Sequence, residues 1–218
     1  MDTPVVMSRL SDHQLLTRAR QGDGSAYGEL FERHARAVYS YCFRRTADWA
    51  LAEDCTSIVF LEAWRRRRSV QLAGDTLLPW LLGVANNVLR NQARSQRRWH
   101  AALGRLAPPV PEPDFAEAST DRLDDQQRMR AVLELIRQLP SGDQDVLAMC
   151  GWAGLSYEQA AVALGVPLGT VRSRLSRARA RLRDLEHQLA ANSDAPADTQ
   201  QASATQRPGT ATGATDAN

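Results

Sequence analysis

The sequence contains no lysine, so all 27 of its basic side chains are arginines. Arginine suits phosphate and guanine edges, but a complete lack of lysine more simply reflects a GC-rich genome and carries little weight. Aromatic residues make up only 6% of the 218 residues. Strict alternation of apolar and polar residues is scarce, which argues against a sheet-rich fold. We therefore expect an all-α protein.

The sequence also lacks the marks of a membrane or secreted protein. No stretch approaches the roughly 20 apolar residues of a membrane helix, and residues 1–10 have no long apolar run of the kind found in a signal peptide. We expect a protein without membrane insertion that works in the cytoplasm.

Only three cysteines and four histidines are present. Cys42, Cys55 and Cys150 form no CxxC pair and have no histidine at zinc-ligand spacing, so we expect buried, reduced thiols. No histidine has a nucleophile or carboxylate at motif spacing, and no glycine-rich phosphate loop occurs. We interpret each histidine as a surface residue: His13, His34, His100 and His187. These absences predict a protein with no catalytic residues, no metal site and no cofactor.

The formal net charge of +2 hides two separate basic regions. Residues 65–100 contain eight arginines and one acid, and residues 156–183 contain six arginines and one acid. The acids gather before residue 63 and over residues 112–125. Such segregation favours two contacts with an anionic partner.

The spacing of apolar residues predicts four helices in the first half of the chain. The first follows the capping pair Ser11-Asp12, the second covers residues 25–45, the third covers residues 49–67, and the fourth begins at Pro79. In the second, Phe31 belongs to the apolar stripe. In the third, Leu51, Ile58 and Leu61 widen the stripe, which predicts burial on several sides. Residues 69–78 are expected to form a loop.

A proline-rich, acidic stretch at residues 103–123 has the composition of a linker. It separates an expected domain at residues 11–102 from a second one at residues 124–189. In that second domain we expect one helix ending at Pro140, another over residues 143–150 broken by Gly151, and two more over residues 156–164 and 168–189. The remaining residues, 190–218, have no large apolar side chain, so disorder is expected there.

The strongest motif is the segment LSYEQAAVALGVPLGTVRSRLSRAR, residues 155–179. It has the pattern of a helix-turn-helix: Ser156 caps the first helix, Ala160 allows a close crossing, Gly165 makes the turn, and Val166 fills the space between the helices. On the second helix, a buried stripe is predicted at Val171, Leu175, Ala178 and Leu182. The opposite face then presents Arg172, Ser173, Ser176 and Arg177, with Arg174 and Arg179 on its flanks and Thr170 near the start of the helix. These side chains could reach bases and phosphates in a major groove. The predicted DNA-binding residues of this helix are Thr170, Arg172, Ser173, Arg174, Ser176 and Arg177.

This motif resembles the domain-four helix-turn-helix of extracytoplasmic-function sigma factors of bacterial RNA polymerase, which reads the minus-thirty-five promoter element. Two upstream segments resemble domain two of the same family: AED with VFLEAW, residues 52–54 and 59–64, and PWLLGVANNVLR, residues 79–90. The first is similar to the helix that binds core polymerase, and the second to the helix that opens the minus-ten element. Two separated motif sets in the right order are more specific than either alone.

The resemblance implies a role for particular residues. The resemblance implies that core polymerase is bound by Asp54, Ser57, Ile58 and Glu62. It implies that the minus-ten DNA is bound by Asn87, Arg90, Arg94, Arg97 and Arg98. The loop at residues 69–78 would receive a flipped base. Trp80 is interpreted as a core aromatic, and the tetrad Arg65 to Arg68 fits either a solvated helix end or a nucleic-acid contact. The family also implies that the linker threads through polymerase, and an anti-sigma protein is a further possible partner.

The chain departs from the family pattern in two places. Members commonly carry Gln-Glu where this sequence has Ser57-Ile58, so a polar grip on the polymerase is replaced by a small hydroxyl and an apolar branch. Asp54 is then expected to carry more of that contact. Family members often have a basic residue immediately before the position of Asn87, and this chain has Asn86 there. We therefore expect one phosphate contact of the family to be missing.

Three other functions compete with this interpretation. A stand-alone helix-turn-helix regulator would use only the second half and bind DNA without polymerase. A nucleic-acid enzyme would need acids clustered beside a basic face, and the sequence shows none. An adaptor that binds only protein would lack salt-dependent DNA affinity.

Overall fold

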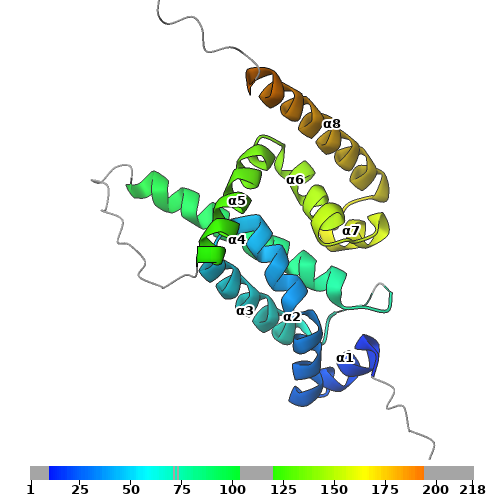
Figure 1. The fold of residues 1–218 in the computed structure, drawn as a ribbon. Helices are drawn as coiled ribbons and strands as arrows, with labels where there is room; N and C mark the ends of the chain where they lie inside the picture. Colours follow the sequence, from blue (N-terminus) through cyan, green and yellow to red (C-terminus); the bar gives the residue numbers. More distant parts are fainter. Residues whose placement is uncertain (1–9, 71, 73, 104–119, 194–218) are drawn as a thin grey trace, which may run out of the picture. The chain divides into compact units, whose positions relative to one another are not determined.

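In the computed structural model, the described residues are 10–70, 72, 74–103 and 120–193, and all regular structure within them is helical (Figure 1). The all-α prediction is confirmed. In chain order the elements are α1 (Asp12–Arg20), α2 (Gly24–Thr46), α3 (Trp49–Arg66), α4 (Leu78–Leu103), α5 (Thr120–Arg137), α6 (Ser141–Leu147), the π-helical segment η1 (Ala148–Trp152), α7 (Tyr157–Leu164) and α8 (Leu168–Ser193).

Side-chain caps set the beginnings of the first three helices. Ser11 accepts a hydrogen bond from the Gln14 amide, and the Gln14 side chain bonds back to the Ser11 amide, which completes a capping box. Asp23 caps α2 and Asp48 caps α3 through their carboxylates. Each cap satisfies amides that would otherwise lack a partner, and each contributes about 1 kcal/mol. Pro79 lies in the first turn of α4, where its missing N–H costs nothing.

The core of the first four helices is formed by their shared apolar faces. Leu15, Leu30, Val38, Val59 and Leu81 are fully buried. Full burial of such side chains stabilises the fold by about 1.5 to 3 kcal/mol each. One histidine also enters this core: His34 is buried and contacts Asp12, so its prediction as a surface residue is wrong.

The second group of helices, α5 to α8, follows the expected order with one local difference. Helix α5 ends at Arg137, just before Pro140, and α6 begins at Ser141. The predicted break at Gly151 is instead a π-helical segment, η1, that passes through this glycine. Helix α5 begins at Thr120, inside the predicted linker. Residues 104–119 and 194–218, which hold most of the linker and of the predicted tail, lie outside the described residues.

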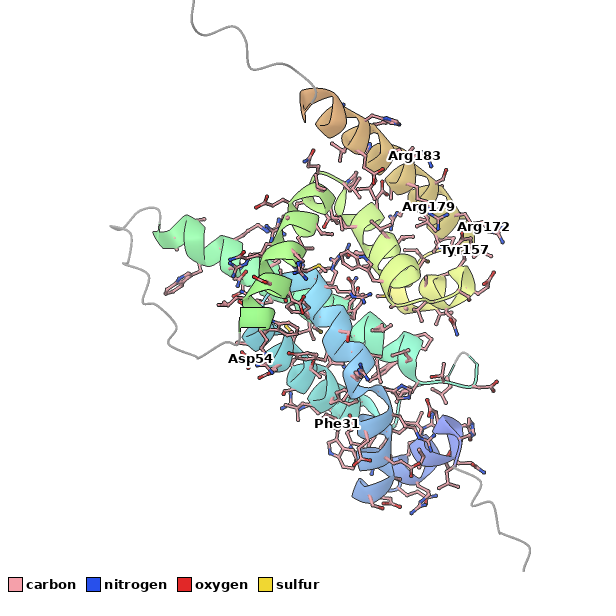
Figure 2. All side chains as sticks on the ribbon, viewed as in Figure 1. Phe31, Asp54, Tyr157, Arg172, Arg179 and Arg183 are labelled. Carbon is pink, nitrogen blue, oxygen red and sulfur yellow. The ribbon has the colours of Figure 1, made fainter. Side chains whose placement is uncertain are left out.

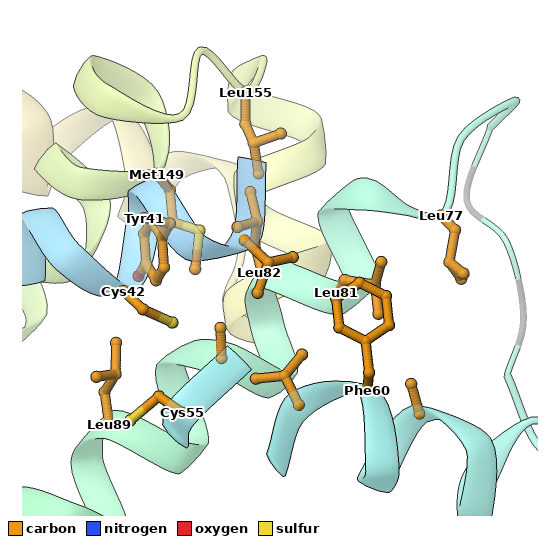
Figure 3. Packing of buried hydrophobic residues seen from close by; sticks show 14 of the residues in the cluster. Tyr41, Cys42, Cys55, Phe60, Leu77, Leu81, Leu82, Leu89, Met149 and Leu155 are labelled. Atoms are coloured by element: carbon orange, nitrogen blue, oxygen red, sulfur yellow. The ribbon is translucent and has the colours of Figure 1, made fainter. Parts of the chain in front are cut away.

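Both groups of helices contribute to one contiguous core, whereas the sequence predicted two domains joined by a linker. Met149 and Leu155 pack into the same cluster as Tyr41, Leu82 and Leu89 (Figure 3). Helices α4 and α7 lie against each other. A methyl group added at Gly83 would lie 2.5 Å from the Ala163 carbonyl oxygen, so only glycine permits this approach. The described residues up to and including Leu182 form one compact unit, and a second unit begins at Arg183.

Among the described residues, no helix combines the length and apolar character that crossing a membrane requires.

Candidate nucleic-acid and polymerase interfaces

The helix-turn-helix is formed by α7, a turn at Gly165 and the first turns of α8. Ser156 and Gln159 form a capping box at the start of α7. Gly165 adopts a left-handed conformation, with φ 63°, that favours glycine. Ala160 is fully buried and Val166 is half-buried, as the motif predicts.

One side of α8 is buried in the core, and the opposite, basic side is exposed. Val171, Leu175 and Ala178 are buried, and Leu182 is half-buried against them. The predicted DNA-binding side chains lie on the other side, where Arg172 and Arg179 are visible (Figure 2). Those that are exposed are Arg172, Ser173, Ser176 and Arg177, whereas Thr170 and Arg174 are half-buried.

Two arginines of α8 are held by a buried carboxylate of α6. Asp143 is buried, and its oxygens lie 3.5 Å from Arg177 Nη2 and 3.7 Å from Arg181 Nη1. A buried carboxylate is costly unless it is paired. Arg177 therefore stabilises the motif in addition to facing outward, whereas Arg172 has no ion pair with any described residue. No local sequence pattern predicts this difference, because Asp143 lies 34 residues from Arg177 along the chain.

The basic half of α4 presents its predicted DNA contacts to solvent. Asn87, Arg90, Arg94, Arg97 and Arg98 are all exposed. Arg90 differs from the others because its Nη2 lies 2.6 Å from an oxygen of Asp145 in α6.

Asp145 is the buried partner of two arginines. Only 2% of its surface is exposed, and its second oxygen lies 2.9 Å from Arg45 Nη2 in α2. This carboxylate therefore joins α6 to both α2 and α4. The packing of the two helix groups occupies a side chain that the sequence assigned to promoter DNA.

Asn86 has a structural role in place of the phosphate contact that the family pattern would supply. It is buried, and its side-chain oxygen accepts a hydrogen bond of 3.2 Å from the Tyr41 hydroxyl. Burial raises the pKa of Tyr41 well above its ordinary value, so the phenol stays protonated and remains a donor.

The predicted polymerase-binding residues share one face of α3. Asp54, Ser57 and Ile58 are exposed, and Glu62 is partly exposed and forms ion pairs with Arg65 and Arg66. Asp54 is visible on α3 in Figure 2.

Apolar side chains on and beside this face are also exposed, which the sequence analysis missed. Ile58 is 44% exposed, Leu61 is 48% exposed, and Phe31 of α2 is 43% exposed while its ring packs edge-on against Phe60. The prediction that the wide stripe of α3 is buried on several sides is therefore wrong for Ile58 and Leu61, and Phe31 does not belong to the buried stripe of α2. Exposed apolar clusters of this kind are typical of protein-binding surfaces.

The arginine tetrad at the end of α3, Arg65 to Arg68, is divided between internal and exposed positions. Arg67 lies over the Trp64 ring, 3.8 Å from its centre, and donates to the Ala19 and Trp64 carbonyls. Arg65 and Arg66 pair with Glu62, and Arg68 is exposed. Trp80 is half-buried against the core, which agrees with its interpretation as a core aromatic.

The three cysteines are free thiols: Cys42 and Cys55 are buried and Cys150 is half-buried. Burial raises the pKa of all three, to about 12 for Cys42. Within the described residues, no three or more metal-binding side chains cluster at a distance that could hold an ion.

Comparison with known proteins identifies both halves of the chain. Residues 30–99 match the family model "Sigma-70 region 2", and residues 129–182 match "Sigma-70, region 4". The match to region 2 covers the half that a stand-alone helix-turn-helix regulator would lack.

Individual relatives agree with the family models. The chain is 31% identical over 174 residues to the RNA polymerase sigma factor CarQ of Myxococcus xanthus, covering 80% of this chain and 97% of that protein. It is 32% identical over 152 residues to the ECF RNA polymerase sigma factor SigL of Mycobacterium tuberculosis, covering 67% and 80%.

Solved structures share the fold. CnrH, in complex with the cytosolic domain of CnrY, aligns with a TM-score of 0.61 at 22% identity, covering 84% of this chain and 99% of that one. The sigma factor RpoE of Bartonella quintana, in complex with the anti-sigma factor NepR, aligns with a TM-score of 0.56 at 24% identity, covering 74% and 96%. With region 2 and region 4 both matched and a full-length relative above 30% identity, this chain belongs to the extracytoplasmic-function sigma factors of the sigma-70 family.

Proposed function

We propose that this sigma factor directs promoter-specific initiation through three surfaces: the exposed face of α3 for core polymerase, α4 for the minus-ten element, and α8 for the minus-thirty-five element. The observation that carries the proposal is the separation of two arginine-rich faces from an exposed apolar and acidic face within one chain. The chain itself supplies recognition, and the polymerase supplies the chemistry, so we propose no catalytic role and no cofactor. A partner of core polymerase works in the cytoplasm.

On DNA, α8 enters the major groove with its exposed face toward the bases. Arg172, Ser173 and Ser176 are the best placed for base edges, because they are exposed and Arg172 has no described ion-pair partner. Arg177 and the half-buried Thr170 and Arg174 are proposed to contact the phosphate backbone of the DNA. On α4, Arg94, Arg97 and Arg98 follow the phosphates of the opened strand, with Asn87 facing the bases.

On the polymerase side, the residues that replace the usual polar pair contribute apolar contact. Ile58 and Leu61 each leave about half of their surface exposed, and Phe31 of α2 is also exposed while its ring packs against Phe60 of α3. Asp54 and Glu62 on the same face add charge for orientation. We propose that Phe31, Ile58 and Leu61 form the apolar centre of the core-binding surface.

An anti-sigma protein is a further proposed partner. The two solved structures named above each contain a partner protein: the cytosolic domain of CnrY in one case and the anti-sigma factor NepR in the other. In this chain a groove between α4 and the α5–α6 region is lined by arginines and leucines, among them Arg94, Arg97, Arg137, Leu89 and Leu133. An acidic amphipathic helix would complement such a groove.

The polymerase surface can be tested with an exposed apolar control on another helix. We expect the double variant Ile58→Gln and Leu61→Gln to lose core polymerase affinity by about tenfold or more, which corresponds to at least 1.4 kcal/mol. The control Val132→Gln removes a similarly exposed apolar side chain from α5 and should stay within about twofold of wild type. Equal affinity of both variants and wild type for core polymerase would refute the proposed surface.

A further inference from the structure

Helix α1 contacts the connection between α3 and α4 at its α3 end. Arg20, in the last turn of α1, donates to the carbonyls of Arg67 (3.3 Å) and Val70. In return, Arg67 donates to the Ala19 carbonyl at 3.0 Å. These bonds join α1 to the point where the chain leaves α3.

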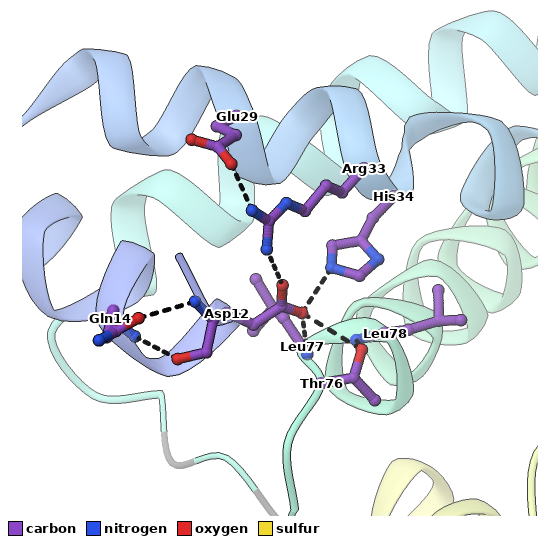
Figure 4. Close-up of polar contacts among 9 residues, drawn as sticks. Asp12, Gln14, Glu29, Arg33, His34, Thr76, Leu77 and Leu78 are labelled. Atoms are coloured by element: carbon purple, nitrogen blue, oxygen red, sulfur yellow. Dashed lines mark hydrogen bonds and ion pairs between the residues drawn. The ribbon is translucent and has the colours of Figure 1, made fainter. Parts of the chain in front are cut away.

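The first turn of α1 contacts the other end of the same connection (Figure 4). Oδ2 of Asp12 accepts hydrogen bonds from the Leu77 amide at 2.8 Å and from the Thr76 hydroxyl at 3.2 Å. The same carboxylate contacts His34 Nε2 at 2.7 Å and Arg33 Nη1 at 3.2 Å, both on α2. One carboxylate thus joins α1, α2 and the start of α4.

These contacts determine where α4 begins. The Leu77 carbonyl accepts the first helical bond of α4, from the Leu81 amide, while the Leu77 amide is held by Asp12. The Thr76 hydroxyl accepts from the Leu78 amide as it donates to Asp12. Asp12 is only 6% exposed, and such a buried carboxylate is stable because each oxygen has partners. Its geometry is therefore tightly specified.

We propose that Asp12 is a positioning residue for minus-ten recognition: with Arg20, it fixes both ends of the α3–α4 connection relative to the DNA-facing side of α4. Asp12 touches no DNA in this role. It acts through Thr76 and Leu77, whose placement sets the start of the helix that carries Asn87. This proposal rests on the proposed function of α4 in reading the minus-ten strand.

The test measures base preference, because partial unfolding lowers binding to every strand equally and leaves a preference ratio unchanged. Holoenzyme is assembled from core polymerase and wild type, Asp12→Ala, Asp12→Asn, Thr76→Ala or the control Asp23→Asn. Asp23 also contacts α1, through Arg18, but lies at the start of α2, and asparagine remains a good cap there. The probes are the single-stranded minus-ten oligonucleotide that wild-type holoenzyme selects from a randomised pool and the same strand with each base substituted in turn.

We expect Asp12→Ala to reduce the preference for the selected strand by about tenfold or more, since displacement of a recognition element by about 1 Å has effects of this size or larger. Asp12→Asn keeps one oxygen for the Leu77 amide and should retain part of the preference, Thr76→Ala should lose less than Asp12→Ala, and Asp23→Asn should match wild type. Affinity for core polymerase should be unchanged in all four variants.

An unchanged preference ratio in Asp12→Ala would overturn the proposal. If affinity for the selected and the substituted strands also fell by the same factor, Asp12 would be assigned to stability alone. Failure of the proposed function looks different, because wild-type holoenzyme would then select no strand from the pool.

Discussion

Replacement of Gly83 by alanine is expected to weaken the packing between the two helix groups without lowering the stability of either group by itself. The added methyl would lie 2.5 Å from the Ala163 carbonyl oxygen and 3.3 Å from its carbonyl carbon. Both are backbone atoms of α7, so no side-chain rotation can relieve the overlap. Helix α7 must move away from α4.

The two effects of this substitution have opposite signs. Alanine in place of glycine inside α4 favours the helix itself by about 1 kcal/mol. Overpacking against α7 costs about 1 to 3 kcal/mol. The equilibrium between packed and separated helix groups should therefore shift toward separation by about 5-fold to 150-fold. Because Asp145 pairs with Arg90 only in the packed arrangement, separation also releases Arg90.

Calorimetry and DNA binding by the free protein measure these effects. We expect one cooperative unfolding transition for wild type and two for Gly83→Ala, with the variant binding promoter DNA more tightly in the absence of polymerase. The matched control is Gly28→Ala in α2, where an added methyl meets no atom within 4 Å. It should raise stability without splitting the transition. A single transition and unchanged DNA affinity for Gly83→Ala would refute the reasoning.

Three further predictions concern single side chains. Arg172→Ala should weaken binding to a matched minus-thirty-five duplex by about 1 to 3 kcal/mol and leave the melting temperature of the protein unchanged. Arg177→Ala should also lower the melting temperature, because Asp143 loses a partner. Equal melting temperatures for the two variants would contradict this. The Cys42 thiol should resist alkylation at pH 8 until the protein unfolds, because burial raises its pKa to about 12, and rapid labelling of native protein would contradict this. Burial alone would raise the pKa of Asp12, but the Leu77 amide, His34 and Arg33 hold that pKa below its ordinary value. The ionised carboxylate therefore stabilises the fold fully above the unfolded-state pKa of about 3.9. This stabilisation is lost as the pH falls through the lower folded-state pKa. Urea unfolding of Asp12→Asn should therefore show a weaker pH dependence in the acid range than wild type, and identical profiles would exclude this role.

Local features of this fold could be predicted from the sequence because their causes are local. The caps Ser11 and Ser156 act on amides three residues away, and Gly165 makes its turn by its own backbone freedom. The buried stripe of α8 follows from helical periodicity, and with it the exposed basic face. These features carry the helix-turn-helix and most of its candidate DNA contacts.

Features that depend on distant partners could not be predicted in this way. Arg90 and Arg94 look alike in sequence, but only Arg90 meets the buried carboxylate of Asp145. An apolar residue such as Ile58 satisfies a buried stripe and a partner-facing surface equally well, so periodicity alone assigned it to the interior. Gly83 is similarly ambiguous until the position of α7 is known.

The most direct test of the account is run-off transcription with purified core polymerase on genomic promoter fragments. We predict specific transcripts that require this chain, weak promoter binding by the chain alone, and loss of transcripts when the Ile58 and Leu61 surface is changed to glutamine. Absence of any chain-dependent transcript, together with tight promoter binding in the absence of polymerase, would contradict it.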